Sequence, residues 1–223
     1  MKPTIARHLW ISGFDFRISD FSRLILALLV CLTLTGCFGF LKPARSSARS
    51  FVLTAIQSDA ATTGLPSTAG VGVGPVKVPT YLFDSSLAVR TGTNEVSYQT
   101  SVLWAERLDN GIQRVLAANL SILLPSDSVR LSAWRSQDVS AEVYVTVNRL
   151  DIDDKGQGVL TARWRISAPG GEKILKTGTS QFTRTGPAAG SDPSGAINTL
   201  SELVSDLSRQ LAQAIREVAA SEK

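Results

Sequence analysis

The stretch V-S-A-E-V-Y-V-T-V-N, residues 139–148, decides the fold class of this chain of 223 residues. Apolar residues stand at every second position with polar residues between them, which is the pattern of a β-strand with one buried face. Two further strands are expected at residues 159–168 and 173–185. A loop at 151–158 precedes the first of them, and a Pro-Gly-Gly turn at 169–171 precedes the second. The three strands predict an antiparallel meander.

The second strand of this meander separates its side chains by chemical character. Its inner face is expected to carry Leu160, Ala162, Trp164 and Ile166. Its outer face is expected to carry Thr161, Arg163, Arg165 and Ser167. The alternation places one face of the strand in a core.

Two helices are expected to pack on this sheet. Apolar residues recur three and four positions apart over residues 108–124, which predicts a helix whose Gln113 and Arg114 face away from the core. Asp192 and Pro193 supply a capping residue and a first-turn proline for the second helix. The apolar stripe of the second helix consists of Leu200, Leu203, Val204, Leu207, Leu211, Ile215 and Val218.

Shorter strands complete the predicted fold, at residues 51–57, 71–78, 87–90, 95–101 and 129–134. The second of these overlaps G-V-G-V-G-P, residues 70–75, which lacks the spacing of nucleotide-binding glycine loops. We interpret it as a strand whose backbone approaches a neighbour closely. Together the elements predict a single α/β domain, bordering on α+β, with a mixed sheet that contains the meander and is packed by two main helices.

Composition excludes most catalytic classes. Both cysteines, Cys31 and Cys37, lie within the first 37 residues, and so do the single histidine, His8, and the single methionine, Met1. The chain from Phe38 onward therefore lacks the residues of histidine triads, cysteine nucleophiles, disulfides and the usual zinc sites. We expect no enzyme, no catalytic residue, no metal and no cofactor.

Charge argues against nucleic-acid binding. The formal net charge is +4, and the basic residues are scattered singly among acidic ones. Proteins that bind nucleic acid usually concentrate their basic residues in one stripe or patch. Nucleic acid is therefore not expected as a partner.

Residues 1–36 are expected to be a lipoprotein signal peptide. The apolar run at 24–34 has 11 residues, about 16 Å as a helix, whereas a membrane core is about 30 Å thick. It is followed by L-T-G-C, residues 34–37, which resembles the bacterial lipobox, where a signal peptidase cuts before a cysteine that becomes lipidated. The alternative is an uncleaved anchor in which the apolar run extends to residue 41, the lower limit of spanning length.

Cys37 is the predicted lipidation site, carrying a diacylglycerol group and acyl chains such as palmitate. Each buried methylene contributes about 0.8 kcal/mol, so several acyl chains make the attachment to the membrane lasting. Residues 37–50 are polar after the first few positions and are expected to form a tether. Phe38 stands where lipoproteins of enterobacterial type carry Asp for inner-membrane retention, so this resemblance implies the periplasmic face of the outer membrane.

Two linked motifs resemble the ABC-type transport auxiliary lipoprotein family, the PqiC/YmbA-like proteins. They are V-G-V-G-P-V-K-V-P-T-Y-L at residues 71–82, followed by Arg90, and L-W-A-E-R-L-D-N-G-I-Q-R-V-L-A-A-N-L-S at residues 103–121. This chain has Leu103 and Arg107 where the family often has Arg and Pro. The resemblance implies an α/β domain with a mixed sheet. It also implies a lipoprotein that accompanies an ABC permease and ATPase and an MCE-domain protein in lipid transport between membranes and in envelope integrity.

We therefore expect residues 51–223 to form the auxiliary lipoprotein domain, a non-catalytic docking subunit that receives the end of an MCE assembly. Tyr81, Arg90 and Trp104, near strand and loop ends, are the expected partner contacts, although they could equally be half-buried core residues. The alternative function is an outer-membrane lipoprotein that regulates envelope assembly, such as a cell-wall synthase activator. Direct carriage of phospholipid and a homo-oligomeric state stay open.

Overall fold

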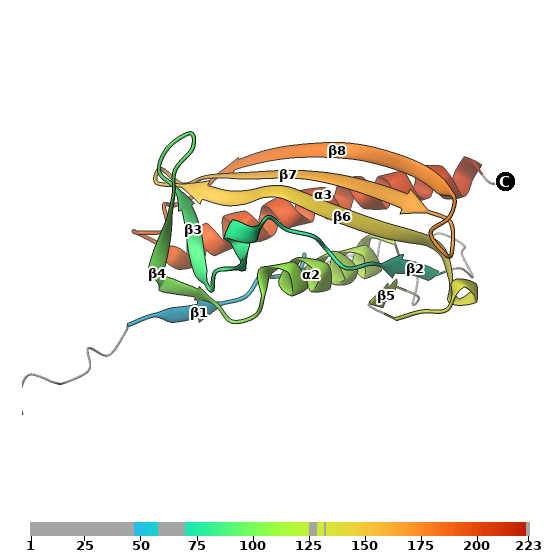
Figure 1. Ribbon diagram of the computed structural model, residues 1–223, viewed down its shortest axis with the longest axis horizontal. Coiled ribbons are helices and arrows are strands. Elements are labelled where there is room, and N and C mark those ends of the chain that lie inside the picture. Colours follow the sequence, from blue (N-terminus) through green and yellow to red (C-terminus); the bar gives the residue numbers. More distant parts are fainter. Residues whose placement is uncertain (1–46, 58–69, 125–128, 132, 222–223) are drawn as a thin grey trace, which may run out of the picture. The chain divides into compact units, whose positions relative to one another are not determined.

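The computed structural model describes residues 47–57, 70–124, 129–131 and 133–221 (Figure 1). The predicted signal peptide, the lipidation site Cys37 and most of the predicted tether lie outside these described residues. Among the described residues no helix is long and apolar enough to cross a membrane.

The described residues form a mixed sheet of eight strands. The strands are β1 (Arg49–Phe51), β2 (Gly70–Val73), β3 (Ser86–Arg90), β4 (Val96–Trp104), β5 (Val129–Leu131), β6 (Val139–Asp153), β7 (Gln157–Ser167) and β8 (Ile174–Thr185). One path through the sheet runs β1-β4-β3-β6-β2-β5, and β7 and β8 continue from the other edge of β6. The predicted α/β class with a mixed sheet is confirmed, since β2 pairs parallel to β6 while β7 pairs antiparallel to it.

β6, β7 and β8 form the predicted meander, and β6 is its centre. With 15 residues, β6 is long enough to pair with β2 along its first part and with β3 at its last two residues. The inner residues expected for β7, from Leu160 to Ile166, are buried. Ser167, expected on the outer face, is also buried, because it lies opposite Glu142, which accepts hydrogen bonds from Trp134 and from the Gly170 amide at this end of the sheet.

The predicted loop between β6 and β7 is too long. β6 continues to Asp153, and the turn occupies residues 154–156, where Gly156 has a φ of 88° that favours glycine. Asp153 Oδ1 accepts hydrogen bonds from the backbone amides of Lys155 and Gln157, which closes the turn. Asp151, expected in this loop, is therefore a strand residue.

Helix α3 (Pro193–Ser221) runs along one face of the meander, and α2 (Leu108–Leu123) packs beside α3 (Figure 1). The predicted cap is confirmed, since Asp192 Oδ1 accepts a hydrogen bond of 3.0 Å from the Gly195 amide. Every residue of the predicted apolar stripe of α3 is buried. Gln113 of α2, expected to face away, is instead buried and donates to the carbonyl oxygen of Val73 in β2 at 3.0 Å. A long polar side chain here satisfies a backbone acceptor at the interface of helix and sheet.

The predicted strand at residues 51–57 is wrong in extent, because β1 ends at Phe51. Beyond it the backbone bonds to the helices: the Thr54 amide donates to Ser201 Oγ at 3.1 Å, and the Ile56 amide donates to Asn119 Oδ1 at 2.8 Å. The side chains of α2 and α3 thus replace a strand partner for this segment. Two other predicted strands are also shorter, since β2 ends at Val73 and β5 ends at Leu131.

Gly72 of β2, and Gly74 directly after β2, confirm the interpretation of a close approach. A Cβ atom at Gly72 would lie 2.5 Å from the Trp134 ring, and one at Gly74 would lie 2.6 Å from the Tyr144 ring. Val71 and Val73, which alternate with these glycines, are buried in the core. The alternation of valine and glycine therefore gives β2 one face for the core and one face on which aromatic rings lie.

Candidate functional site

Asp151 is the centre of a polar cluster beneath the surface of the protein. Its side chain is 0% exposed, yet it is a carboxylate. Arg90 of β3 donates to Asp151 Oδ2 from Nη2 at 2.7 Å and from Nε at 3.1 Å. Arg149 of β6 donates from Nε to Asp151 Oδ1 at 2.8 Å. Two guanidinium groups thus offset the cost of taking this carboxylate out of water.

Tyr81 joins this cluster from the short helix η1 (Thr80–Phe83). Its hydroxyl donates to Asp151 Oδ2 at 3.2 Å. Burial raises the pKa of Tyr81, and the negative charge of Asp151 raises it further, while Arg90 acts in the opposite direction. The hydroxyl therefore stays protonated and serves as a donor that fixes η1 on the sheet.

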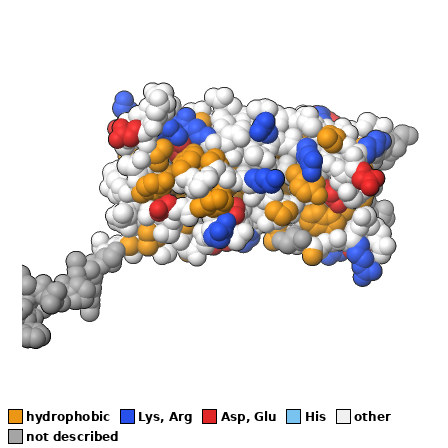
Figure 2. Space-filling model, in the orientation of Figure 1, with side chains coloured by type: hydrophobic (Ala, Val, Ile, Leu, Met, Phe, Trp, Pro, Cys, Tyr) orange, Lys and Arg blue, Asp and Glu red, His pale blue; other side chains and the backbone are white. Residues whose placement is uncertain are grey.

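Aromatic side chains surround η1 on the outside of this cluster. Phe83 is 48% exposed and Tyr98 of β4 is 40% exposed. Tyr98 donates from its hydroxyl to the carbonyl oxygen of Tyr81 at 3.0 Å, and the guanidinium carbon of Arg107 lies 4.8 Å from the centre of the Phe83 ring. We call Tyr81, Phe83, Tyr98 and Arg107 the η1 surface. Figure 2 shows hydrophobic side chains gathered over η1, β3 and β4.

The η1 surface is held from below by the core. Leu82, between its two aromatic neighbours, is buried in the main hydrophobic cluster. Arg107 is fixed in turn by Asp109, to which it donates from Nη2 at 2.8 Å and from Nε at 3.2 Å. The exposed rings are therefore placed by contacts that exist before any partner binds.

The structure brings together two of the three residues expected to contact a partner. Tyr81 and Arg90 meet on Asp151. Trp104 lies at the other end of β4, eight residues after Val96, the register partner of Arg90, which corresponds to about 26 Å along the strand. There it pairs in register with Phe51 of β1 and packs, partly buried, against the core.

Several residues of this region were not expected from the sequence. Phe83 and Tyr98 carry the exposed aromatic area, and Asp151 with Arg149 supports it. A run of T-Y-L-F after a proline, residues 80–83, is the one signal that could have indicated an exposed aromatic turn. Arg149 is the one partner of Asp151 that lies nearby in the sequence, and nothing local marks Asp151 as buried, because Arg90 and Tyr81 lie 61 and 70 residues earlier.

The groups of the site hold the cluster together and leave aromatic and arginine side chains exposed at the surface. Both oxygens of Asp151 are occupied by donors, so the carboxylate is committed to holding the cluster together. In the part of the chain that the structure describes, no group of three or more His, Cys, Asp or Glu residues could hold a metal ion. Exposed Tyr, Phe and Arg side chains are the types that are enriched where proteins bind one another.

Known structures share this fold. A Xanthomonas campestris protein of family DUF330 has a crystal structure that matches with a TM-score of 0.64 at 10% identity, over 78% of this chain and 98% of that one. The crystal structure of an uncharacterized protein matches with a TM-score of 0.60 at 20% identity, over 75% of this chain and 99% of that one. At such identities the likeness shows the fold alone. None of the curated proteins matches this chain.

The sequence itself matches a family model. That model, described as the ABC-type transport auxiliary lipoprotein component, matches residues 51–212. The match covers well over half of the chain and includes both motifs on which the resemblance rests, together with the η1 surface. This chain therefore belongs to the ABC-type transport auxiliary lipoprotein component family.

Proposed function

We propose that this protein is a non-catalytic docking subunit of an ABC-type lipid transport system. Acyl chains on Cys37 hold it in the outer membrane, with the folded domain in the periplasm. Its partner is an MCE-domain protein that works with the permease and the ATPase. The family match and the lipobox-like L-T-G-C at residues 34–37 support this proposal.

The observation that carries the docking role is the exposure of Phe83 and Tyr98 on a rigid support. Binding normally costs free energy to immobilise side chains. Here Arg107 already lies over Phe83, and Tyr98 is already hydrogen-bonded to η1, so much of that cost is met within the free protein. Burying such rings against a partner removes apolar area from water and favours association.

The residues expected from the sequence have different places in this proposal. Tyr81 lies within the η1 surface, and Arg90 supports it through Asp151. Trp104, at the far end of β4, is proposed as a separate contact. Docking through these side chains involves only non-covalent contacts and no reaction of the partner, which agrees with a subunit that acts by binding.

A pull-down tests the docking role. The bait is the chain from residue 38 onward, which contains all the described elements and lacks the lipidated cysteine. We expect it to recover the MCE-domain protein encoded with the transporter, and the double variant Phe83→Ser/Tyr98→Ser to lose most of that recovery. Ile174→Ser is the matched control, because Ile174 is 55% exposed but lies on β8. A folded bait that recovers no MCE-domain protein would overturn the proposal.

A further inference from the structure

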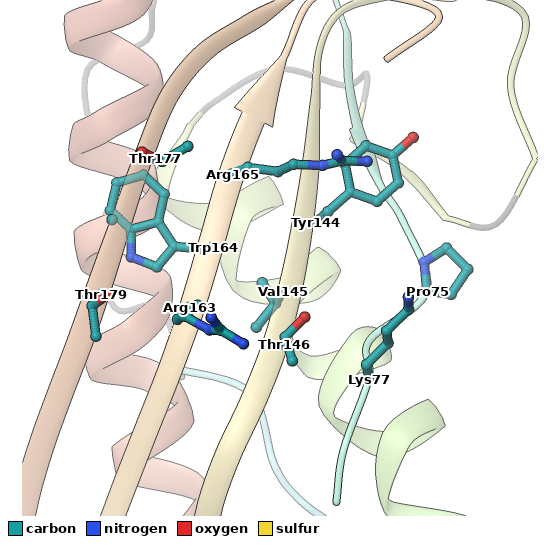
Figure 3. Close-up of a pocket in the computed structure, with 11 residues that line it drawn as sticks. Pro75, Lys77, Tyr144, Val145, Thr146, Arg163, Trp164, Arg165, Thr177 and Thr179 are labelled. Atoms are coloured by element: carbon teal, nitrogen blue, oxygen red, sulfur yellow. The ribbon is translucent and has the colours of Figure 1, made fainter. Parts of the chain in front are cut away.

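The face of the meander opposite α3 carries a groove of about 530 Å³ (Figure 3). It lies over β6 and β7, and the segment that follows β2 forms one of its sides. Three cationic side chains line it, Lys77, Arg163 and Arg165. A volume of this size is typical of sites for small molecules.

The cations of the groove have no close carboxylate partner among the described residues, although Glu142 acts electrostatically on Arg165 at longer range. In the described part of the chain, no carboxylate oxygen lies within 4.0 Å of a side-chain nitrogen of Lys77, Arg163 or Arg165. On the opposite face of the sheet, by contrast, Lys176 and Arg184 of β8 are paired with carboxylates of α3. The groove on the open face therefore holds three cations that form no ion pair among the described residues.

The strand register places two of these cations on either side of Thr146. On one side of β6, Lys77 forms an isolated parallel β-bridge with Thr146. On the other side, Arg163 of β7 is the register partner of Thr146. Since neighbouring strands lie about 4.8 Å apart, the backbones of the two cations are about 10 Å apart. Figure 3 shows Arg163 extending from β7 toward Thr146. Two cationic side chains that flank Thr146 on one face of the sheet favour an anion between them.

The third cation is held in place by an aromatic ring. The guanidinium carbon of Arg165 lies 4.5 Å from the centre of the Tyr144 ring. Tyr144 lies beside Thr146 on β6, and its ring packs over Gly74. Threonine hydroxyls line the remaining edges of the groove, from Thr146, Thr177 and Thr179. The groove therefore combines guanidinium, ammonium and hydroxyl donors around one concave surface.

We propose that this groove binds the phosphate of a phosphate ester, over Thr146 and between Lys77 and Arg163. Phosphate presents several acceptor oxygens in a compact group, which suits guanidinium donors, and the Thr146 hydroxyl can donate to a further oxygen. The phosphate comes either from a soluble ester or from a phospholipid headgroup. The inference does not depend on the docking role, because the groove shares no residue with the η1 surface.

Titration with two phosphate sources tests this inference. Backbone amide shifts of the chain from residue 38 onward are followed while glycerol 3-phosphate is added, with glycerol as the uncharged comparison. Binding to a phospholipid headgroup is tested by flotation of the protein with phosphatidylglycerol vesicles, in comparison with phosphatidylcholine vesicles. We expect saturable shifts at residues 77, 146 and 163 with the soluble ester, flotation with the phosphatidylglycerol vesicles, or both. A response to the soluble ester alone assigns the groove to soluble esters, and a response that includes the vesicles assigns it to headgroups.

Charge variants separate a site from general attraction. We expect Lys77→Gln/Arg163→Gln to weaken binding by about tenfold or more, since charge-assisted hydrogen bonds are lost. Lys155→Gln/Lys173→Gln removes two exposed lysines outside the groove and should leave binding unchanged. The inference would be overturned if both double variants lost the same amount of binding affinity, or if the amide shifts were scattered over the surface. Binding of a glutamate-rich peptide in place of phosphate would overturn it as well. The shift spectrum of each variant also reports that it is folded.

Discussion

Arg90 and Asp151 form an ion pair of 2.7 Å in which the Asp151 side chain is completely buried and the Arg90 side chain is 19% exposed. Removing one partner of a buried ion pair leaves the other charge without compensation. Arg90→Ala should therefore lower the free energy of unfolding by about 3 kcal/mol, even though Arg149 still contacts Asp151. Urea denaturation at pH 7 measures the change. Arg163→Ala, which removes an exposed arginine without an ion pair among the described residues, is expected to change stability by less than about 0.5 kcal/mol.

The same ion pair should also affect the η1 surface. Arg90 holds the carboxylate that Tyr81 contacts, so its loss loosens η1 as well as the core. Amide hydrogen exchange in η1 should accelerate in Arg90→Ala more than exchange in α3, which has no contact with this cluster among the described hydrogen bonds. Equal acceleration in both elements would show that Arg90 acts on global stability only.

Acid stability should depend on Asp206 of α3. Hydrogen bonds from Arg184 lower the pKa of Asp206 below its ordinary value of 3.8, although partial burial acts against them. Because the folded state binds this proton more weakly than the unfolded state, the pair stabilises the fold above about pH 4. That stabilisation is lost as the pH falls through the lowered pKa. Asp206→Asn should therefore lower the free energy of unfolding at pH 7. It should also reduce the difference between the free energies of unfolding at pH 7 and at pH 3.

Urea denaturation of both proteins at the two pH values measures this effect. Asp154→Asn provides the comparison, because Asp154 lies exposed in the turn between β6 and β7. If Asp206→Asn loses as much stability between pH 7 and pH 3 as the unmodified protein, Asp206 is not a source of the acid sensitivity.

Any side chain at position 72 should destabilise the protein. A Cβ atom there would lie 2.5 Å from the Trp134 ring, closer than Cβ atoms in proteins approach non-bonded heavy atoms. Gly72→Ala should therefore cost about 1–3 kcal/mol, as overpacking does. Gly190→Ala is the matched control, since no atom lies within 4 Å of its Cβ position. Combining Gly72→Ala with Trp134→Ala should cost less than the sum of the two single changes, and a purely additive result in thermal unfolding would contradict the ring contact.

Periodicity in the sequence predicts the meander and both helices because their burial repeats every two, three or four residues. The same alternation places Arg163 and Arg165 on the open face. It does not predict that Lys77 lies across β6 from Arg163, because that pairing joins segments 86 positions apart in the chain. The burial of Asp151 is equally hard to predict: an acidic residue after a strand suggests a turn, and only the fold brings Arg90, 61 residues earlier, to its carboxylate.

The extent of β1 shows a second reason why the sequence does not predict every element of the fold. Residues 51–57 have the composition of a strand, yet their backbone amides find partners in Ser201 and Asn119 on the helices. Strand propensity describes a side chain that fits a half-buried surface, and a helix pair can supply that surface as well as a sheet can. The position of an extended segment in the fold thus depends on tertiary contacts.

Anchoring should depend on Cys37 and not on Cys31. If the sequence L-T-G-C at residues 34–37 is processed as a lipobox, the mature chain in native membranes begins at Cys37 and is heavier by a diacylglycerol group and an acyl chain. Mass spectrometry of the membrane fraction measures both features. Cys37→Ser should abolish the lipid mass and the cleavage, whereas Cys31→Ser, within the apolar run, should leave both intact. A leader that remains attached to an unmodified Cys37 would instead support the uncleaved anchor, because the apolar run extended to residue 41 reaches the lower limit of spanning length.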